Sequence, residues 1–289
     1  MIVVNSLAMT FVLLAAVAHA GWNFAAKGIG GSGSAIVWLY SMVSTVVCLP
    51  FAIVFACTEQ HGPQWSWLLA ALVSAAAHVG YGIVLQRGYA VGDLSVVYPL
   101  ARGTGPLLSV LFAVLLFGER PGVLGLIGAA AVVLGVLVIS SGGSRAAGSR
   151  ALSIGYGVAT GATIAVYTLW DDHSMTGIGV PPIVYFGLTV LGESVMLAPI
   201  AARDFGVVAG IWRKNWRRVV IIGVLSPVAY LLVLYAMRIA PVSLVAPARE
   251  SSIVLGALAG WLLLREPNPV RRLIGSAIAL AGIVALGLS

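Results

Sequence analysis

The sequence contains very little charge. Only 9% of its 289 residues are Asp, Glu, Lys or Arg, whereas soluble domains carry about 25%. Hydrophobic residues make up 60% of the chain. Because a water-soluble globular protein needs a polar surface, this composition excludes that class and indicates an integral membrane protein.

Cysteine is also scarce, and the familiar catalytic motifs are missing. The two cysteines, Cys48 and Cys57, lie in or beside one apolar run, so we interpret them as small apolar side chains rather than a disulfide. The sequence holds no Walker A, HExxH, GxSxG or DDxxD-like pattern. ATP-driven transport and the familiar membrane-embedded hydrolases and prenyl transferases therefore lack their characteristic residues. We expect no enzyme activity, no cofactor and no metal site.

Long apolar runs are abundant. Ten of them follow one another, separated by short connections, at about residues 3–26, 34–57, 65–86, 94–117, 121–141, 152–170, 181–201, 217–237, 242–264 and 269–288. The longest connections are 142–151 and Arg203 to Arg218, and neither could form a soluble domain. The first run has no basic n-region, so we interpret it as a span and not as a signal peptide. The pattern predicts an all-α integral membrane fold of ten transmembrane helices.

One stretch of the sequence appears twice. Tyr98 to Pro121 and Ala246 to Pro267 each hold a proline, an arginine two or three residues later, a long apolar run and a closing Glu-Pro or Glu-Arg-Pro. One constant offset pairs the two arginines, Arg102 and Arg249, and also the two closing glutamates. We therefore predict two five-span units, residues 1–141 and 152–289. Because five is odd, the second unit must be inverted relative to the first, about an axis in the membrane plane.

Basic residues gather on one side of the predicted membrane. The loops after the odd-numbered spans hold twelve of them, whereas the other loops hold two, Arg120 and Arg238. The positive-inside rule then places the odd-numbered loops in the cytoplasm and both termini outside. Since topology accounts for the net charge of +7, we predict no nucleic-acid partner.

Arg102 is the foremost candidate for a functional role. It lies about eight residues inside a span, on the order of 12 Å from the membrane surface at 1.5 Å per residue. A charge at that depth must face a cavity or a partner. One interpretation is substrate binding or gating, and the other is a structural arginine bonded to backbone carbonyls freed by nearby prolines. Arg249 and Glu250 occupy the matching place. As helix neighbours they should point apart, so we expect one of them to meet Arg102.

Residues that disturb helices surround these charges. They are Pro99, Gly103, Gly105, Pro106 and Pro247. A proline removes one helical hydrogen bond and kinks the span, and the freed backbone groups can line a water-filled cavity. We predict that these residues act as hinges or gates, and the alternative is a static packing kink.

Polar and aromatic side chains within other spans form a second group of candidates. They are His19, Trp22, Asn23, His78, Tyr81, Tyr98, Tyr167, Trp170 and Tyr230. Together they predict an aromatic-walled pocket for an amphipathic ligand. Each residue taken alone is also typical of an interfacial belt or of packing.

Acidic residues supply three further hypotheses. Glu193 lies within the seventh span without a partner nearby in sequence, so it is either a proton carrier or a protonated or capped packing residue. Asp171 to His173 has a metal-like composition, but three consecutive loop residues cannot converge on one ion, so we predict a pore-mouth loop. Glu119 and Glu266 close their spans beside arginines, which predicts ordinary charge clusters at the ends of the helices.

These features resemble a known family. The doubled proline-arginine block with its Gly-Glu-Arg-Pro or Arg-Glu-Pro end, the ten spans and the five-plus-five symmetry are similar to the drug/metabolite transporter superfamily. Within it they most resemble EamA-type members, which include amino-acid exporters of the YddG type. The resemblance covers nearly the whole chain, and Pro99, Arg102, Pro247 and Arg249 match the block. It implies ten helices around a central cavity, lined mainly by spans 1, 3, 4, 6, 8 and 9, and alternating access.

The residues and the resemblance together predict a secondary transporter that exports small amphipathic metabolites such as amino acids from a bacterial-type inner membrane. An arginine near the midplane would bind a carboxylate, and Glu250 or an aromatic face would hold an ammonium group. The expected partners are a small-molecule substrate and the lipid bilayer, with protons as an option at Glu193; a monomer suffices. The alternatives are an importer of a cationic or sugar-like solute and, in another class, a membrane-embedded enzyme or an assembly subunit.

Overall fold

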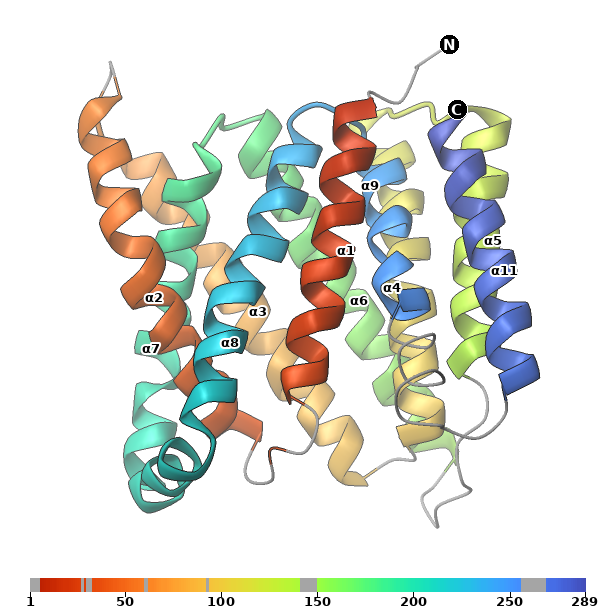
Figure 1. Cartoon of the computed structure of the whole chain (residues 1–289). Coiled ribbons are helices and arrows are strands. Elements are labelled where there is room, and N and C mark those ends of the chain that lie inside the picture. The colour runs from red at the N-terminus through yellow and green to blue at the C-terminus, as the bar shows by residue number, and fades with distance from the viewer. Residues whose placement is uncertain are drawn as a thin grey trace.

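The computed structural model describes residues 6–26, 29, 33–59, 62–91, 94–140, 150–255 and 269–289. Within these ranges the chain is almost entirely helical and contains no strand. The helices are α1 (Ser6–Ala26), α2 (Gly33–Thr58), α3 (Trp65–Val91), α4 (Leu94–Phe117), α5 (Gly122–Ser140), α6 (Arg150–Thr176), α7 (Pro182–Arg203), α8 (Phe205–Met237), α9 (Val242–Arg249) and α11 (Pro269–Gly287). They form one bundle, in which the start of α1 and the end of α11 lie at the same edge (Figure 1).

The bundle has the surface of a membrane protein. The helices α1 to α8 are each long and apolar enough to cross a membrane, and α11 holds a shorter apolar stretch, Leu273–Leu286. The span expected at 242–264 continues beyond the described residues. Large apolar side chains such as Phe51, Leu116 and Val123 are exposed, which lipid tolerates and water does not. The predicted all-α integral membrane fold is therefore confirmed, and Cys48 and Cys57 are both free, as predicted.

The helix contacts reveal the two-unit architecture. α2 packs on α7, α4 on α9 and α5 on α11, so each of these contacts joins a helix to its own counterpart. Other contacts occur in matched pairs: α4 on α6 with α9 on α1, α1 on α8 with α6 on α3, and α3 on α7 with α8 on α2. A twofold axis produces this exchange. Because each unit has an odd number of spans, the axis lies in the membrane plane, as predicted for an inverted repeat.

Glycines make the twofold relation visible at single residues. A Cβ added to Gly128 would lie 2.9 Å from the carbonyl oxygen of Gly282, and one added to Gly135 would lie 2.5 Å from that of Gly275. The repeat offset pairs Gly128 with Gly275 and Gly135 with Gly282, so these two contacts exchange with each other. The absence of side chains lets α5 and α11 approach backbone to backbone.

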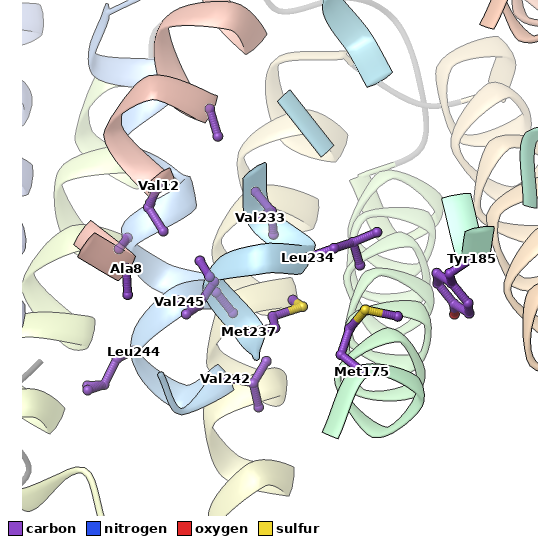
Figure 2. Packing of buried hydrophobic residues seen from close by; sticks show 14 of the residues in the cluster. Ala8, Val12, Met175, Tyr185, Val233, Leu234, Met237, Val242, Leu244 and Val245 are labelled. Atoms are coloured by element: carbon purple, nitrogen blue, oxygen red, sulfur yellow. The ribbon is translucent and has the colours of Figure 1, made fainter. Parts of the chain in front are cut away.

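Apolar packing fixes the turn between α8 and α9. Val12 of α1, Leu234 and Met237 of α8, Val245 of α9 and Met175 of α6 are buried in one cluster, part of which Figure 2 shows. Inside a bilayer, where the lipid is as apolar as these side chains, such packing is stabilised by van der Waals contact rather than by removal from water. This cluster holds the start of α9 against elements of both units.

Glu119 ties the end of α4 to the beginning of α9. Its carboxylate oxygens accept backbone hydrogen bonds from the N–H groups of Val242 and Ser243, each at 2.9 Å. The first amides of a helix lack helical partners and carry the positive end of its dipole. Glu119 is thus a cap supplied by another helix, a more specific role than the charge cluster predicted from the sequence. Its counterpart Glu266 lies outside the described residues.

Two segments predicted as loops are helical. Most of Arg203 to Arg218 lies in α8, which is kinked at Asn215 (φ −131°, ψ 16°). Before the kink, exposed Phe205 and Trp212 accompany basic residues, a composition typical of the membrane interface. The predicted pore-mouth loop, Asp171 to His173, lies within α6. The helix continues there because other helices supply hydrogen bonds to the acidic side chain of Asp171.

Candidate functional site

Three buried charged side chains meet where α4 packs on α9. Arg102 Nη1 lies 3.6 Å from Glu250 Oε2, and Arg249 Nε lies 3.9 Å from Glu250 Oε1. The exposed fractions of the Arg102, Arg249 and Glu250 side chains are 17%, 10% and 2%. One carboxylate is therefore shared by two guanidinium groups, one from each unit. The contact between Arg102 and Glu250 is the meeting across the axis that the repeat predicts.

The contact between Arg249 and Glu250 corrects the expectation that these neighbours point apart. α9 ends at Arg249, and the N–H of Glu250 donates to the carbonyl of Pro247, three residues back, at 3.0 Å. This spacing is tighter than that of an α-helix. Pro247 also has no N–H to continue the regular pattern. The tightened turn brings the side chains of Arg249 and Glu250 together, as regular helical spacing would not.

The charges and hydrogen bonds of this cluster are not balanced. Two guanidinium groups face one carboxylate, and Glu250 Oε2 is buried without a hydrogen-bond partner among the described residues. The buried Nε2 of His19 on α1 likewise lacks one, and His19 is close enough to interact electrostatically with Arg102 and Arg249. Buried polar groups are normally hydrogen-bonded. These atoms are therefore suited to contact a polar ligand or water.

Aromatic rings surround the charges. The Arg102 guanidinium carbon lies 5.6 Å from the centre of the Tyr98 ring, and that of Arg249 lies 5.9 Å from the centre of the Tyr167 ring. Tyr81 stands edge-on to Tyr167, with ring centres 5.6 Å apart. Cations are attracted to such ring faces. The structure thus brings together six of the residues singled out from the sequence: Arg102, Arg249, Glu250, Tyr81, Tyr98 and Tyr167.

His78 connects these rings to a second polar cluster. Its ring stacks on Tyr167, with centres 4.2 Å apart and planes 27° from parallel. Its Nε2 lies 3.2 Å from the hydroxyl oxygen of Tyr230 on α8, and its Nδ1 lies 2.9 Å from the carbonyl oxygen of Ser74. His78 is partly exposed. It therefore links the arginine cluster to a buried hydrogen-bond network.

Asp171 is the centre of that network, and the sequence interpretation missed it. The carboxylate is fully buried and accepts hydrogen bonds from Ser74 Oγ at 2.7 Å, from the Tyr185 hydroxyl at 2.5 Å and from the Tyr230 hydroxyl. Three helices, α3, α7 and α8, are thereby tied to α6. Helical spacing could have identified Asp171, because it lies four residues after Tyr167 and faces the same side if the helix continues.

The other predicted aromatic and amide residues separate into two groups. Trp22 stands edge-on to His19, with ring centres 4.8 Å apart, and so packs on the histidine that interacts with the arginines. The Asn23 amide is exposed and donates to the His19 carbonyl at 2.8 Å, so the structure does not bring Asn23 to the charges. Trp170 Nε1 donates to the Ala70 carbonyl at 2.9 Å, which joins α6 to α3.

Glu193 on α7 faces the Asp171 network rather than the arginine cluster. Ser41 Oγ of α2 donates to Glu193 Oε2 at 3.1 Å. Glu193 also interacts electrostatically with His78 and Asp171. Across the described ranges, no group of three His, Cys, Asp or Glu side chains is placed to hold a metal ion.

The predicted hinge residues have different structural settings. α4 is one continuous helix through both of its prolines. A Cβ at Gly103 or Gly105 would lie 2.8 Å from a side-chain atom of α5 or α6, respectively, so both glycines permit close helix packing. Pro247 instead accompanies the end of α9. Hinge motion at these residues stays a prediction.

Comparisons with known proteins agree with this architecture. A family model described as the EamA-like transporter family matches residues 6–141 and again residues 151–288. Among solved structures 29 chains match. One of these, described only as "Crystal structure of protein", is 19% identical, with 97% of this chain and 96% of that chain covered and a TM-score of 0.79. That likeness shows the fold alone. No curated protein matches the sequence significantly.

Proposed function

The chain belongs to the EamA-like transporter family, and from this premise we propose that it exports small amphipathic metabolites such as amino acids by alternating access. As a member of this family, the chain is a multi-pass membrane transporter of the drug/metabolite transporter superfamily, whatever its substrate. The observation that carries the finer proposal is the sharing of one buried carboxylate, Glu250, by Arg102 and Arg249.

The excess positive charge favours a carboxylate on the substrate. Two guanidinium groups cannot both be neutralised by Glu250, and a buried unpaired charge is costly. A substrate carboxylate would supply the second negative charge, and the planar guanidinium of Arg102 can bind it through two parallel hydrogen bonds. Arg102 is the more exposed of the two arginines, so it is the better placed to receive the ligand.

The rings around the charges favour an amphipathic substrate. Tyr81, Tyr98 and Tyr167 offer apolar faces beside the arginines, and such faces accept both an apolar side chain and an ammonium group. Small-molecule sites commonly combine apolar walls with a few polar anchors. An amino acid matches this combination in charge and in polarity.

The location of the cluster supports alternating access. Arg102 belongs to the first unit, whereas Arg249 and Glu250 belong to the second. Rocking of one unit against the other would therefore change the distance between Arg102 and Glu250 and leave that between Arg249 and Glu250 nearly constant. Binding sites between repeats are typical of transporters built from inverted halves.

Counterflow in proteoliposomes tests the proposal directly. Vesicles preloaded with unlabelled amino acids should accumulate labelled amino acid transiently, and vesicles preloaded with sugars or organic cations should not. If counterflow occurred only with sugars or organic cations, the protein would still be a transporter, but its substrate would not be an amino acid. An absence of counterflow with every solute would instead favour an enzyme or an assembly subunit.

Orientation in a bacterial-type inner membrane belongs to the same proposal. The charge of the loops supports an external location for both termini. A cytoplasm-dependent reporter should be active when it is fused after Arg213 and inactive when it is fused after Ser289. The reverse pattern would invert the orientation and leave the fold unchanged.

A further inference from the structure

We propose that His78, Tyr230 and Asp171 form a proton-binding relay that couples transport to proton movement. The proposal rests on the transport function above and concerns its driving ion. It differs from the sequence hypothesis in placing the proton on this chain of side chains rather than on Glu193. The hydrogen-bond donors and acceptors of these side chains determine how many protons they hold.

The first step fixes one proton on His78. Nδ1 lies 2.9 Å from the carbonyl oxygen of Ser74, and a carbonyl can only accept, so Nδ1 carries a hydrogen. The Ser74 hydroxyl is also 3.3 Å from Nδ1, but its single proton is donated to Asp171 at 2.7 Å. That hydroxyl oxygen therefore acts toward His78 as an acceptor as well.

The second step concerns Tyr230, whose hydroxyl contacts both Asp171 and His78. If Tyr230 donates its one proton to Asp171, its oxygen must accept from Nε2, and His78 is then an imidazolium. If Tyr230 donates to Nε2, Asp171 must carry the proton that reaches Tyr230. Both arrangements hold one proton more than a neutral histidine with an ionised aspartate. Without that proton, one of the two contacts has no hydrogen.

The two arrangements interconvert by a concerted transfer. The Nε2–H bond of His78 breaks as its proton bonds to the Tyr230 oxygen, and the Tyr230 O–H bond breaks as its proton bonds to Asp171 Oδ2. One proton moves from the ring to the carboxylate, and no other bond changes. His78 is partly exposed, whereas Asp171 is fully buried. The relay therefore joins an accessible end to a protected one.

Charged and titratable side chains surround the relay on every neighbouring helix. Those that interact with the relay residues themselves are Tyr167 and Asp172 on α6, Tyr185 and Glu193 on α7, and Arg249 on α9. Those one step farther out, beside these residues or the arginine cluster, are His19 on α1, Tyr40 on α2, Tyr81 on α3 and Arg102 on α4. The carboxylate of Glu193 favours an added proton, and the arginines oppose it. The ring of Tyr167 lies between Arg249 and His78.

This geometry couples the proton to the substrate with a definite sign. A carboxylate bound at the arginines offsets their charge and so removes the opposition to a proton on His78. By linkage, a proton on the relay must strengthen carboxylate binding by the same factor. The relay therefore favours movement of the substrate and a proton in the same direction, so export would be driven by the outward gradient of the substrate itself, and an inward proton gradient would drive uptake.

Proteoliposomes with an imposed pH gradient test the relay. Two quantities are measured in the same preparation: the accumulation of a radiolabelled amino-acid mixture driven by the pH gradient, and its counterflow without a gradient. The ratio of the first to the second corrects for altered substrate binding. Tyr230→Phe should lower this ratio by roughly 10-fold or more, because the path for the proton is cut. Tyr185→Phe is the matched control, because it also removes a hydroxyl that donates to Asp171 but leaves the path intact. It should lower the ratio clearly less than Tyr230→Phe does, because only the latter removes a link in the path.

Equal ratios in Tyr230→Phe and Tyr185→Phe, or a wild-type ratio that ignores the pH gradient, would overturn the relay. A readout without substrate separates this failure from that of the proposed function. On acidification in weakly buffered detergent solution, wild-type protein should bind about one proton more per chain than His78→Gln/Asp171→Asn. Proton binding without counterflow would reject the amino-acid substrate and keep the proton site. Counterflow without this difference in proton binding would reject the proton site and keep the amino-acid substrate.

Discussion

The helices α4 and α9 are counterparts in the two units, yet their chemistry differs. Arg102 and Arg249 correspond, but the offset that pairs them places Gly103 opposite Glu250. A Cβ at Gly103 would already lie 2.8 Å from the Leu137 side chain on α5, so an acid there would have to displace that side chain. The symmetric fold therefore carries one carboxylate for two arginines, which produces a single site on the axis rather than two equivalent ones.

The helices α1 and α6 differ in the same way. At an offset of 146 residues, one fewer than the offset that pairs Arg102 with Arg249, Gly21 and Ala25 of α1 stand where α6 has Tyr167 and Asp171. The aromatic link and the buried acid therefore occur once, and both belong to the second unit. Duplication accounts for the scaffold, whereas the departures from duplication hold the candidate chemistry.

The largest effect is expected from Glu250→Gln, which removes the charge that breaks the symmetry. Arg102 and Arg249 would then face each other without a counter-charge, and breaking a buried pair in this way costs about 3–5 kcal/mol. We expect a marked fall in thermal stability in detergent and loss of counterflow. The partly exposed Glu59, at the end of α2, supplies the control Glu59→Gln, which should behave as wild type. A stable and active Glu250→Gln protein would show that the carboxylate is dispensable.

A large effect is also expected where the symmetry is closest. Gly135→Ala would place a Cβ 2.5 Å from the backbone of Gly275, and backbone cannot move aside as a flexible side chain does. Overpacking of this kind costs about 1–3 kcal/mol, so the melting temperature should fall. Gly155→Ala is the control, because its Cβ would meet nothing within 4 Å. Equal stability of the two variants would contradict the close contact of α5 and α11.

The sequence predicts the scaffold well, because apolar length and a constant repeat offset are properties that the chain displays directly. It also predicts that Arg102 contacts the other unit, because a charged side chain so far inside the membrane needs a partner. It does not predict the contact of Arg249 with Glu250, because that contact depends on a local departure from helical geometry. The role of Asp171 was missed because the apolar run ends at Trp170, so the helix was predicted to end there. In the structure, side chains of three other helices donate hydrogen bonds to Asp171, and α6 continues.

An intermediate effect is expected from Arg102→Lys, which keeps the charge and removes the planar fork. Loss of charged hydrogen bonding to a substrate carboxylate, worth about 1.5–3 kcal/mol, should lower amino-acid transport roughly 10-fold or more. The protein should remain monodisperse in detergent. Arg238→Lys, at an exposed arginine just after α8, controls for the substitution itself.

A purely structural Arg102 would give the opposite order of effects. Arg102→Lys and Arg102→Ala would then both impair folding, and the folded remainder would transport with near-normal apparent affinity. Normal folding together with normal amino-acid transport in Arg102→Lys would reject the carboxylate interaction.

The smallest effect is expected from Glu119→Gln, which tests how the second unit is anchored to the first. Glutamine keeps one acceptor oxygen, so one of the two bonds to the first amides of α9 is lost along with the charge that favours a helix N-terminus. The expected cost is about 1–2 kcal/mol, seen as a modestly lower melting temperature, while counterflow stays within about twofold because the arginine cluster is untouched. Arg120→Gln, the exposed neighbour in the same turn, should leave the melting temperature unchanged. If both variants melted alike, the carboxylate would not be stabilising α9, and the apolar contacts of Val245 and Met237 would be sufficient to hold its beginning in place.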